Sequence, residues 1–133
     1  MSIYTTVIEE GVIPNKFTTG EVFFKKRNSS IQPRNTTIKD LVFEPGSRSN
    51  WHTNPGLQLL VATEGVGYFQ ERGDSTRLLN KGDVVTVLPG VEHWYGATPH
   101  STFSHIAIIT EIDKGSVVWL DGVTDEEYNS YSK

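Results

Sequence analysis

The sequence predicts an all-β sandwich or barrel with one short helix at its C-terminus. Turn-forming pairs such as Pro45-Gly46 and Pro89-Gly90 recur roughly every 8 to 12 residues and separate short runs rich in β-branched and aromatic residues. Only residues 124–131 depart from this pattern, because a threonine followed three positions later by a glutamate forms a capping box that begins a helix. A chain of 133 residues is long enough to bury a core without staples.

Strands are expected wherever such a run lies between two turns. In chain order they fall at residues 21–25, 36–44, 57–63, 67–71, 76–79, 84–88, 92–96, 102–111 and 116–120. Glycine and proline interrupt residues 1–20, which are expected to form an extended arm, and a polar loop is expected from residue 26 to Pro33. We therefore expect one domain over residues 1–133, with its barrel core at 36–111.

Three inferences concern the faces and pairing of particular strands. In residues 36–44, alternation places Lys39 on the same face as Leu41 and Phe43, so Lys39 would reach the mouth of an inner pocket if that face is buried; otherwise it is solvated. Glycine at the turn after residues 57–63 predicts that this strand and the next form an antiparallel hairpin. The continuous apolar run at 84–88 is typical of a buried strand.

Composition and charge exclude several classes of protein. The formal net charge is −4, and the longest basic run has three residues, so nucleic acid is not expected as a partner. The chain contains no cysteine, which excludes disulfides, thiolate metal sites and cysteine nucleophiles. No N-terminal basic and apolar signal is present, and no stretch approaches the roughly 20 apolar residues of a membrane span. We expect a soluble, cytoplasmic protein.

Possible metal ligands lie in two places along the chain. His52 and Asn54 are two residues apart and would share one face of a strand, and Gln58 follows after a Pro-Gly bend. His93 comes later, just after another turn. Nitrogen and oxygen donors that converge from two strands suit a first-row divalent ion such as Mn, Fe, Ni or Zn, and this mixed set does not select among them.

The spacing of these residues resembles the first motif of the cupin family. That motif reads glycine, five residues, histidine, any residue, histidine, three or four residues, glutamate or glutamine, six residues, glycine. Here Gly46, His52, Asn54, Gln58 and Gly65 fit every spacing, with asparagine in place of the second histidine. The second family motif is met more loosely by Gly82-Asp83, Pro89-Gly90 and His93. The resemblance implies a double-stranded β-helix of jelly-roll type.

Further matches are similar to one branch of the family, the small bacterial cupins that include manganese-dependent hydroxynitrile lyases. They are Phe43-Glu-Pro-Gly46, Trp51-His-Thr53, Gly82-Asp-Val-Val85, His93-Trp94, His105-Ile-Ala-Ile108 and Val123-Thr-Asp-Glu-Glu-Tyr128. The resemblance implies that His52, Asn54, Gln58 and His93 are the metal ligands. The residues themselves leave two interpretations of Asn54 open, a weak oxygen donor or only a turn residue before Pro55, where asparagine is common. The resemblance also implies a pocket wall at Tyr95, His105 and Ile109, although the lyases have histidine and glutamine where this chain has Tyr95 and Ile109.

Two side chains are interpreted as catalytic. His105 is expected to act as a general base beside the metal, with a hydrogen-bonded pocket wall as the structural alternative. Tyr95, two residues after His93, is expected to donate a hydrogen bond to a substrate oxygen, unless its hydroxyl only meets a backbone carbonyl. A lone histidine on a strand is usually a core residue, but the complete motif spacing favours a ligand role for His52.

Two functions from different classes remain open. The first is a metal-dependent enzyme acting on a small polar organic molecule, by a lyase or decarboxylase type of reaction with the ion as Lewis acid. The second is a cupin whose metal site has degenerated, leaving small-molecule binding or sensing, for which Asn54 is the main evidence. A homodimer is also expected, because the N-terminal strands need a partner edge and cupins often extend their sheets.

Overall fold

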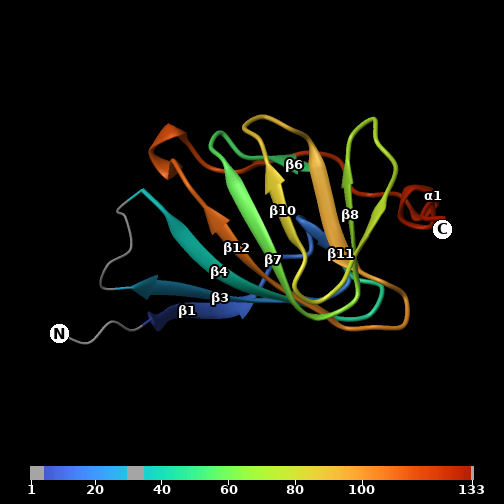
Figure 1. Ribbon diagram of the computed structural model, residues 1–133, viewed down its shortest axis with the longest axis horizontal. Coiled ribbons are helices and arrows are strands. Elements are labelled where there is room, and N and C mark those ends of the chain that lie inside the picture. Colours follow the sequence, from blue (N-terminus) through green and yellow to red (C-terminus); the bar gives the residue numbers. More distant parts are fainter. Residues whose placement is uncertain (1–4, 30–34, 133) are drawn as a thin grey trace.

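The computed structural model describes residues 5–29 and 35–132, which form two antiparallel β-sheets packed face to face (Figure 1). In spatial order, the six-stranded sheet contains β1 (Thr5–Val12), β3 (Val22–Ser29), β4 (Thr37–Phe43), β12 (Phe103–Ile109), β7 (Gln58–Gly65) and β10 (Val84–Val87). The second sheet contains β13 (Val118–Trp119), β6 (His52–Thr53), β11 (His93–Ala97), β5 (Arg48–Ser49), β2 (Thr18–Thr19), β8 (Gly67–Glu71) and β9 (Arg77–Leu79). The predicted all-β jelly roll is confirmed.

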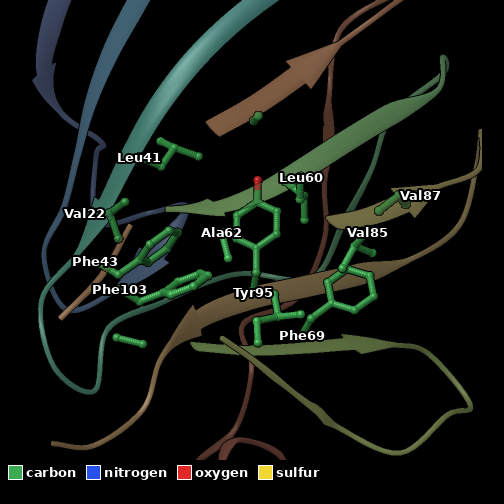
Figure 2. Close-up of a cluster of buried hydrophobic side chains, with 13 residues drawn as sticks. Val22, Leu41, Phe43, Leu60, Ala62, Phe69, Val85, Val87, Tyr95 and Phe103 are labelled. Atoms are coloured by element: carbon green, nitrogen blue, oxygen red, sulfur yellow. The ribbon is translucent and has the colours of Figure 1, made fainter. Parts of the chain in front are cut away.

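The hydrophobic core fills the space between the two sheets. Figure 2 shows Leu41 and Leu60 from the six-stranded sheet facing Phe69 and Tyr95 from the other sheet. Burial alternates along β7 and β12, as expected for strands with one face in the core. In the strand predicted at residues 36–44, the face that carries Lys39, Leu41 and Phe43 is the inward one, because Phe43 is 1% exposed.

The predicted hairpin between residues 57–63 and 67–71 is wrong. β7 pairs with β10 and β12, whereas β8 pairs with β9 and β11, so the two consecutive strands belong to different sheets. Gly65 marks the corner, with a φ of 72° and so little space that a Cβ would lie 1.7 Å from the carbonyl oxygen of Thr102. The turn residue was therefore identified correctly, but the chain crosses between layers there because both strands have a face to bury.

Two other strands differ from the sequence prediction. β10 is only half buried, with Val84 62% exposed, because this strand pairs with β7 alone and lies at the edge of its sheet. β3 continues to Ser29 through residues expected to be loop, since it pairs on both sides and Arg27 forms an ion pair with Asp40 on β4. The N-terminal arm is extended as predicted and contains β1. Residues 1–4 of the arm and residues 30–33 of the expected loop lie outside the described residues.

The C-terminal segment contains a 3-10 turn at Ile112–Lys114 and the helix α1 (Asp125–Tyr128), which lies at the opposite end of the molecule from β1 (Figure 1). The predicted capping box is present, with Thr124 and Glu127 bonding reciprocally, but the helix ends at Tyr128 rather than near residue 131. Arg48 anchors this segment, because its guanidinium donates to the carbonyl oxygen of Val123 and lies 4.5 Å from the centre of the Tyr128 ring. No helix in the described part of the chain is long and apolar enough to cross a membrane.

Candidate functional site

Two histidines face each other on neighbouring strands of the second sheet. His52 on β6 and His93 on β11 are direct partners in the antiparallel register, so their side chains project from the same face. Their ring centroids are 4.2 Å apart, and the two residues are 2% and 0% exposed. The register therefore joins residues that are 41 positions apart in the sequence into one buried pair.

Hydrogen bonds to the backbone fix how both imidazoles are presented. His52 Nδ1 lies 2.9 Å from the carbonyl oxygen of Asn50, and His93 Nδ1 lies 2.9 Å from that of Val91. A carbonyl only accepts, so each Nδ1 carries the hydrogen and each Nε2 is left with a lone pair. Both Nε2 atoms are buried and have no hydrogen-bond partner among the described residues.

Burial also keeps this histidine pair uncharged. It lowers the pKa of His52 to about 3, with a further lowering by the neighbouring His93. It lowers the pKa of His93 to about 4, against the opposing effect of the bond to the Val91 carbonyl. Both rings are therefore neutral at physiological pH, which is the form of histidine that binds metal ions.

Asn54 and Gln58 approach the same place from the chain that links β6 to β7. Gln58 is the first residue of β7 and is fully buried, and Asn54 is 5% exposed. The Asn54 Nδ2 atom donates a 2.6 Å hydrogen bond to Gln58 Oε1, while Gln58 Nε2 is buried without a partner among the described residues. The two amides therefore form a bonded pair beside the two imidazoles.

A cavity of about 240 Å³ opens next to these side chains. Its wall is mostly apolar and aromatic, formed by Ile13, Pro14, Phe17, Phe24, Lys39, Leu41, His52, Asn54, Gln58, Tyr95, Ala107, Ile109, Val117 and Trp119. Trp119 is the partner of His52 across β13 and β6, and it stacks on Phe17 with ring centroids 4.8 Å apart. The N-terminal arm and the C-terminal segment thus close the side of the barrel where the histidines lie.

Tyr95 lines the cavity, and His105 lies behind it, farther from the cavity. Figure 2 shows Tyr95 standing between the two sheets, and its side chain lines the cavity. Burial raises the pKa of Tyr95 to about 12 against a smaller opposing effect of Gln58, so its hydroxyl stays protonated. His105 contacts the Tyr95 ring edge-on at 4.7 Å and stacks on Phe43, and it is not among the lining residues. Burial lowers the pKa of His105 to about 3.

The donor atoms fit a divalent ion better than they fit a closed polar network. Among the residues 5–29 and 35–132, no three His, Cys, Asp or Glu side chains are grouped to hold one ion. The imidazole pair would thus need amide oxygens to complete a coordination shell, and Asn54 and Gln58 are placed next to it. Backbone carbonyls that orient metal-binding imidazoles through Nδ1 are a common supporting arrangement in metal sites.

The structure brings most of the sequence-predicted site residues together. His52, Asn54, Gln58 and Tyr95 share the cavity, His93 contacts His52 behind the wall, and the predicted pocket position Ile109 is also part of the wall. Sequence reasoning missed the arm and tail contributions from Phe17, Val117 and Trp119, because they belong to no motif and reach the cavity only through the tertiary fold.

The fold is a small β-barrel with a buried histidine pair beside its cavity, and comparison with known proteins identifies its family. Residues 39–109, slightly more than half of the chain, match the cupin domain family. The (R)-mandelonitrile lyase of Granulicella tundricola is 37% identical over 115 residues, which cover 86% of this chain and 88% of that protein. The chain therefore belongs to the cupin family.

Solved structures agree with this assignment. A cupin-like protein from Thermotoga maritima is 43% identical and superposes with a TM-score of 0.82, covering 92% of this chain and 94% of the other. A protein from the same organism, described as a predicted oxalate decarboxylase, has a TM-score of 0.71 over 84% of this chain and 99% of its own. At 22% identity, this second likeness shows the fold alone.

Proposed function

We propose that this cupin is a metal-dependent enzyme that breaks a carbon–carbon bond in a small polar molecule, as a lyase or decarboxylase. His52, Asn54, Gln58 and His93 would hold the ion. The observation that carries the proposal is the pair of buried Nε2 atoms on the neighbouring rings of His52 and His93, neither of which has a partner in the described structure. Buried polar atoms are nearly always satisfied, so two that share one site call for a ligand.

A bound divalent ion would supply Lewis acidity, polarising a carbonyl or hydroxyl oxygen of the substrate. The four proposed donor groups are neutral, which leaves the charge of such an ion uncompensated by the protein. Imidazole favours Fe, Ni or Zn, whereas amide oxygens shift the preference toward Mn.

The remaining residues have roles that follow from their positions. Tyr95 presents a protonated hydroxyl to the cavity and would donate a hydrogen bond to the substrate oxygen on which charge develops. Phe17 and Trp119 exclude water from one side of the reacting group. In a cyanohydrin-type cleavage, the hydroxyl proton leaves, the carbon–carbon bond breaks to form a carbonyl, and the departing carbanion takes up the proton.

The general-base role of His105 stays a prediction. Its ring lies behind Tyr95, and a base with a pKa of about 3 is weak compared with one near the working pH. We therefore infer that His105 positions Tyr95. In that case His105→Phe lowers turnover without moving the pH profile, whereas a general base would give a profile that loses its acidic limb.

A second candidate function is metal-free binding or sensing of a small molecule. It is favoured by the 2.6 Å bond between Asn54 and Gln58, because two of the four proposed donor groups satisfy each other. The apolar cavity wall would serve either function.

Metal analysis and turnover separate the two candidates. The protein should be purified without chelators, analysed for Mn, Fe, Ni and Zn, and then assayed with (R)-mandelonitrile and with small 2-hydroxy and 2-keto acids. About one equivalent of metal, together with turnover that a chelator abolishes and the metal restores, supports the enzyme. Protein that takes up no divalent metal and still binds small molecules in the cavity supports the sensing function.

A further inference from the structure

Among the described residues that line the cavity, Lys39 is the one with a charged side chain. It lies on the inward face of β4, two residues from the buried Leu41. Across the sheet its register partners are Ala107 on β12 and Lys26 on β3. The fold therefore places a primary ammonium group on the part of the cavity wall that is formed by the apolar residues Leu41, Ala107 and Ile109.

The described structure offers Lys39 no partner. No hydrogen bond or ion pair reaches its Nζ atom from the residues 5–29 and 35–132. Burial and the like charge of Lys26 lower the pKa of Lys39, and the more distant Glu9 opposes this. Lys39 is partly buried on the cavity wall, where desolvation disfavours an unpaired charge, so a ligand of opposite charge would supply the missing partner.

We propose that the cavity takes a small organic carboxylate, which pairs with Lys39 and lays its apolar body against Leu41, Ala107 and Ile109. This proposal names the class of substrate for the site described under the proposed function. It rests on the proposed function only because both use the same cavity. At about 240 Å³ the cavity is smaller than the roughly 300–1,000 Å³ of pockets for drug-sized ligands, so the acid is small.

The rest of the wall favours the same charge. None of the 14 lining residues is aspartate or glutamate, and the proposed metal ligands are all neutral. An anion therefore meets no like charge inside the cavity, whether or not a metal ion is bound. A cation would face Lys39, and a neutral molecule would leave Lys39 unpaired. The carboxylate class distinguishes this chain from an enzyme built for a neutral nitrile.

The test compares two ligands of nearly equal shape that differ in charge, phenylacetate and phenylacetamide. Binding is measured at pH 7 by calorimetry, in metal-free and in metal-loaded protein, with the change in total tryptophan fluorescence as a second readout. A charge-assisted pair in a partly buried site should make the acid bind at least about tenfold more tightly than the amide. Lys39→Met should remove this preference, and Lys39→Arg should retain most of it.

Lys26→Met is the matched control, because Lys26 is the cross-strand neighbour of Lys39 but does not line the cavity. It should keep the preference for the acid. Equal binding of acid and amide by the wild type overturns the proposal, as does an unchanged preference in Lys39→Met or its loss in Lys26→Met. Circular dichroism confirms that each variant is folded. Because the preference is measured without metal as well, its failure is separate from failure of the proposed metal chemistry.

Discussion

His52 and His93 lie directly opposite each other across β6 and β11, with ring centroids 4.2 Å apart, and each has a buried Nε2 that no described residue bonds. The cross-strand register determines this pairing, and the Nδ1 bonds to backbone carbonyls determine the tautomer. Either a proton or a bound ion can occupy these buried lone pairs. The low pKa of both rings makes the ion the better occupant.

Removing either imidazole should therefore abolish metal binding. We expect His52→Ala and His93→Ala to retain less than a tenth of the metal that the wild type holds after dialysis, measured by elemental analysis. One imidazole and two neutral amide groups would then remain, and amide oxygens bind first-row divalent ions more weakly than imidazole nitrogen does. His100→Ala, at an exposed loop position, is the control and should match the wild type. Full occupancy in both site variants would show that the ion binds elsewhere.

Site residues could be predicted from the sequence where their positions depend on local structure, and not where they depend on contacts between distant segments. The spacing of His52, Asn54 and Gln58 depends on one strand and one bend, so the sequence alone was enough to place them together. The cavity wall at Trp119 depends on β13 reaching β6 from 67 residues away, and no local pattern encodes that. The hairpin prediction at Gly65 failed for the same reason, because glycine suits a corner between two sheets as well as it suits a hairpin turn. Only tertiary contacts decide between the two.

Acid should destabilise the metal-free protein. Burial lowers the pKa of His52 and His105 to about 3 and that of His93 to about 4, whereas each titrates near 6.5 when unfolded. The unfolded state thus binds more protons below pH 6.5, and stability falls as the pH drops from about 6.5 to about 4. Each histidine contributes about 1.4 kcal/mol per pH unit.

Urea unfolding at pH 7, 6 and 5 measures this slope. His105→Phe should reduce the slope by about one third, because one of the three buried histidines is removed while its aromatic contacts with Phe43 and Phe103 are kept. An unchanged slope in this variant would mean that folding does not shift the pKa of His105.

Arg48 should matter for stability far more than the carboxylate that it pairs with. Its side chain is 7% exposed and bonds the Val123 carbonyl, whereas the Asp125 side chain is 91% exposed. Arg48→Met leaves the buried carbonyl of Val123 without its side-chain donor and should cost about 2–3 kcal/mol. Asp125→Asn removes a solvent-screened ion pair and should cost less than about 1 kcal/mol. Chemical denaturation of both variants checks this, and equal losses would contradict it.

A homodimer is predicted from the outer face of the N-terminal strands. Val12 and Phe23 are register partners on β1 and β3, and they are 52% and 36% exposed beside a shallow groove. β1 pairs only with β3 among the described strands, so its other edge is open to a second copy. Light scattering should give twice the chain mass of 14.9 kDa.

Phe23→Glu should shift the protein to monomer by placing a charge in this face. Val84→Glu is the control, because Val84 is 62% exposed at the opposite edge of the same sheet. A wild-type mass of one chain across micromolar concentrations would refute the dimer, and dissociation by Val84→Glu instead would place the interface at β10.

Asn54→His tests the position at which this chain departs from the family motif. An imidazole nitrogen binds first-row divalent ions more strongly than an amide oxygen, and here the Asn54 amide is also engaged by Gln58 at 2.6 Å. Replacing it removes the competing bond and adds a third imidazole beside His52 and His93. The variant should hold close to one equivalent of metal after dialysis, while the wild type loses part of its metal.

Three outcomes of this substitution have different meanings. Tighter binding in Asn54→His shows that the other donors keep a coordination geometry and that the wild-type site is weakened by one atom. Stoichiometric binding by the wild type that the substitution leaves unchanged means that Asn54 does not contact the ion. Absence of metal from Asn54→His, with the protein folded and His52 and His93 intact, means that the pair no longer forms a metal site. The cavity then serves binding or sensing, because imidazoles that cannot be bridged even with a third nitrogen beside them have lost the arrangement that an ion requires.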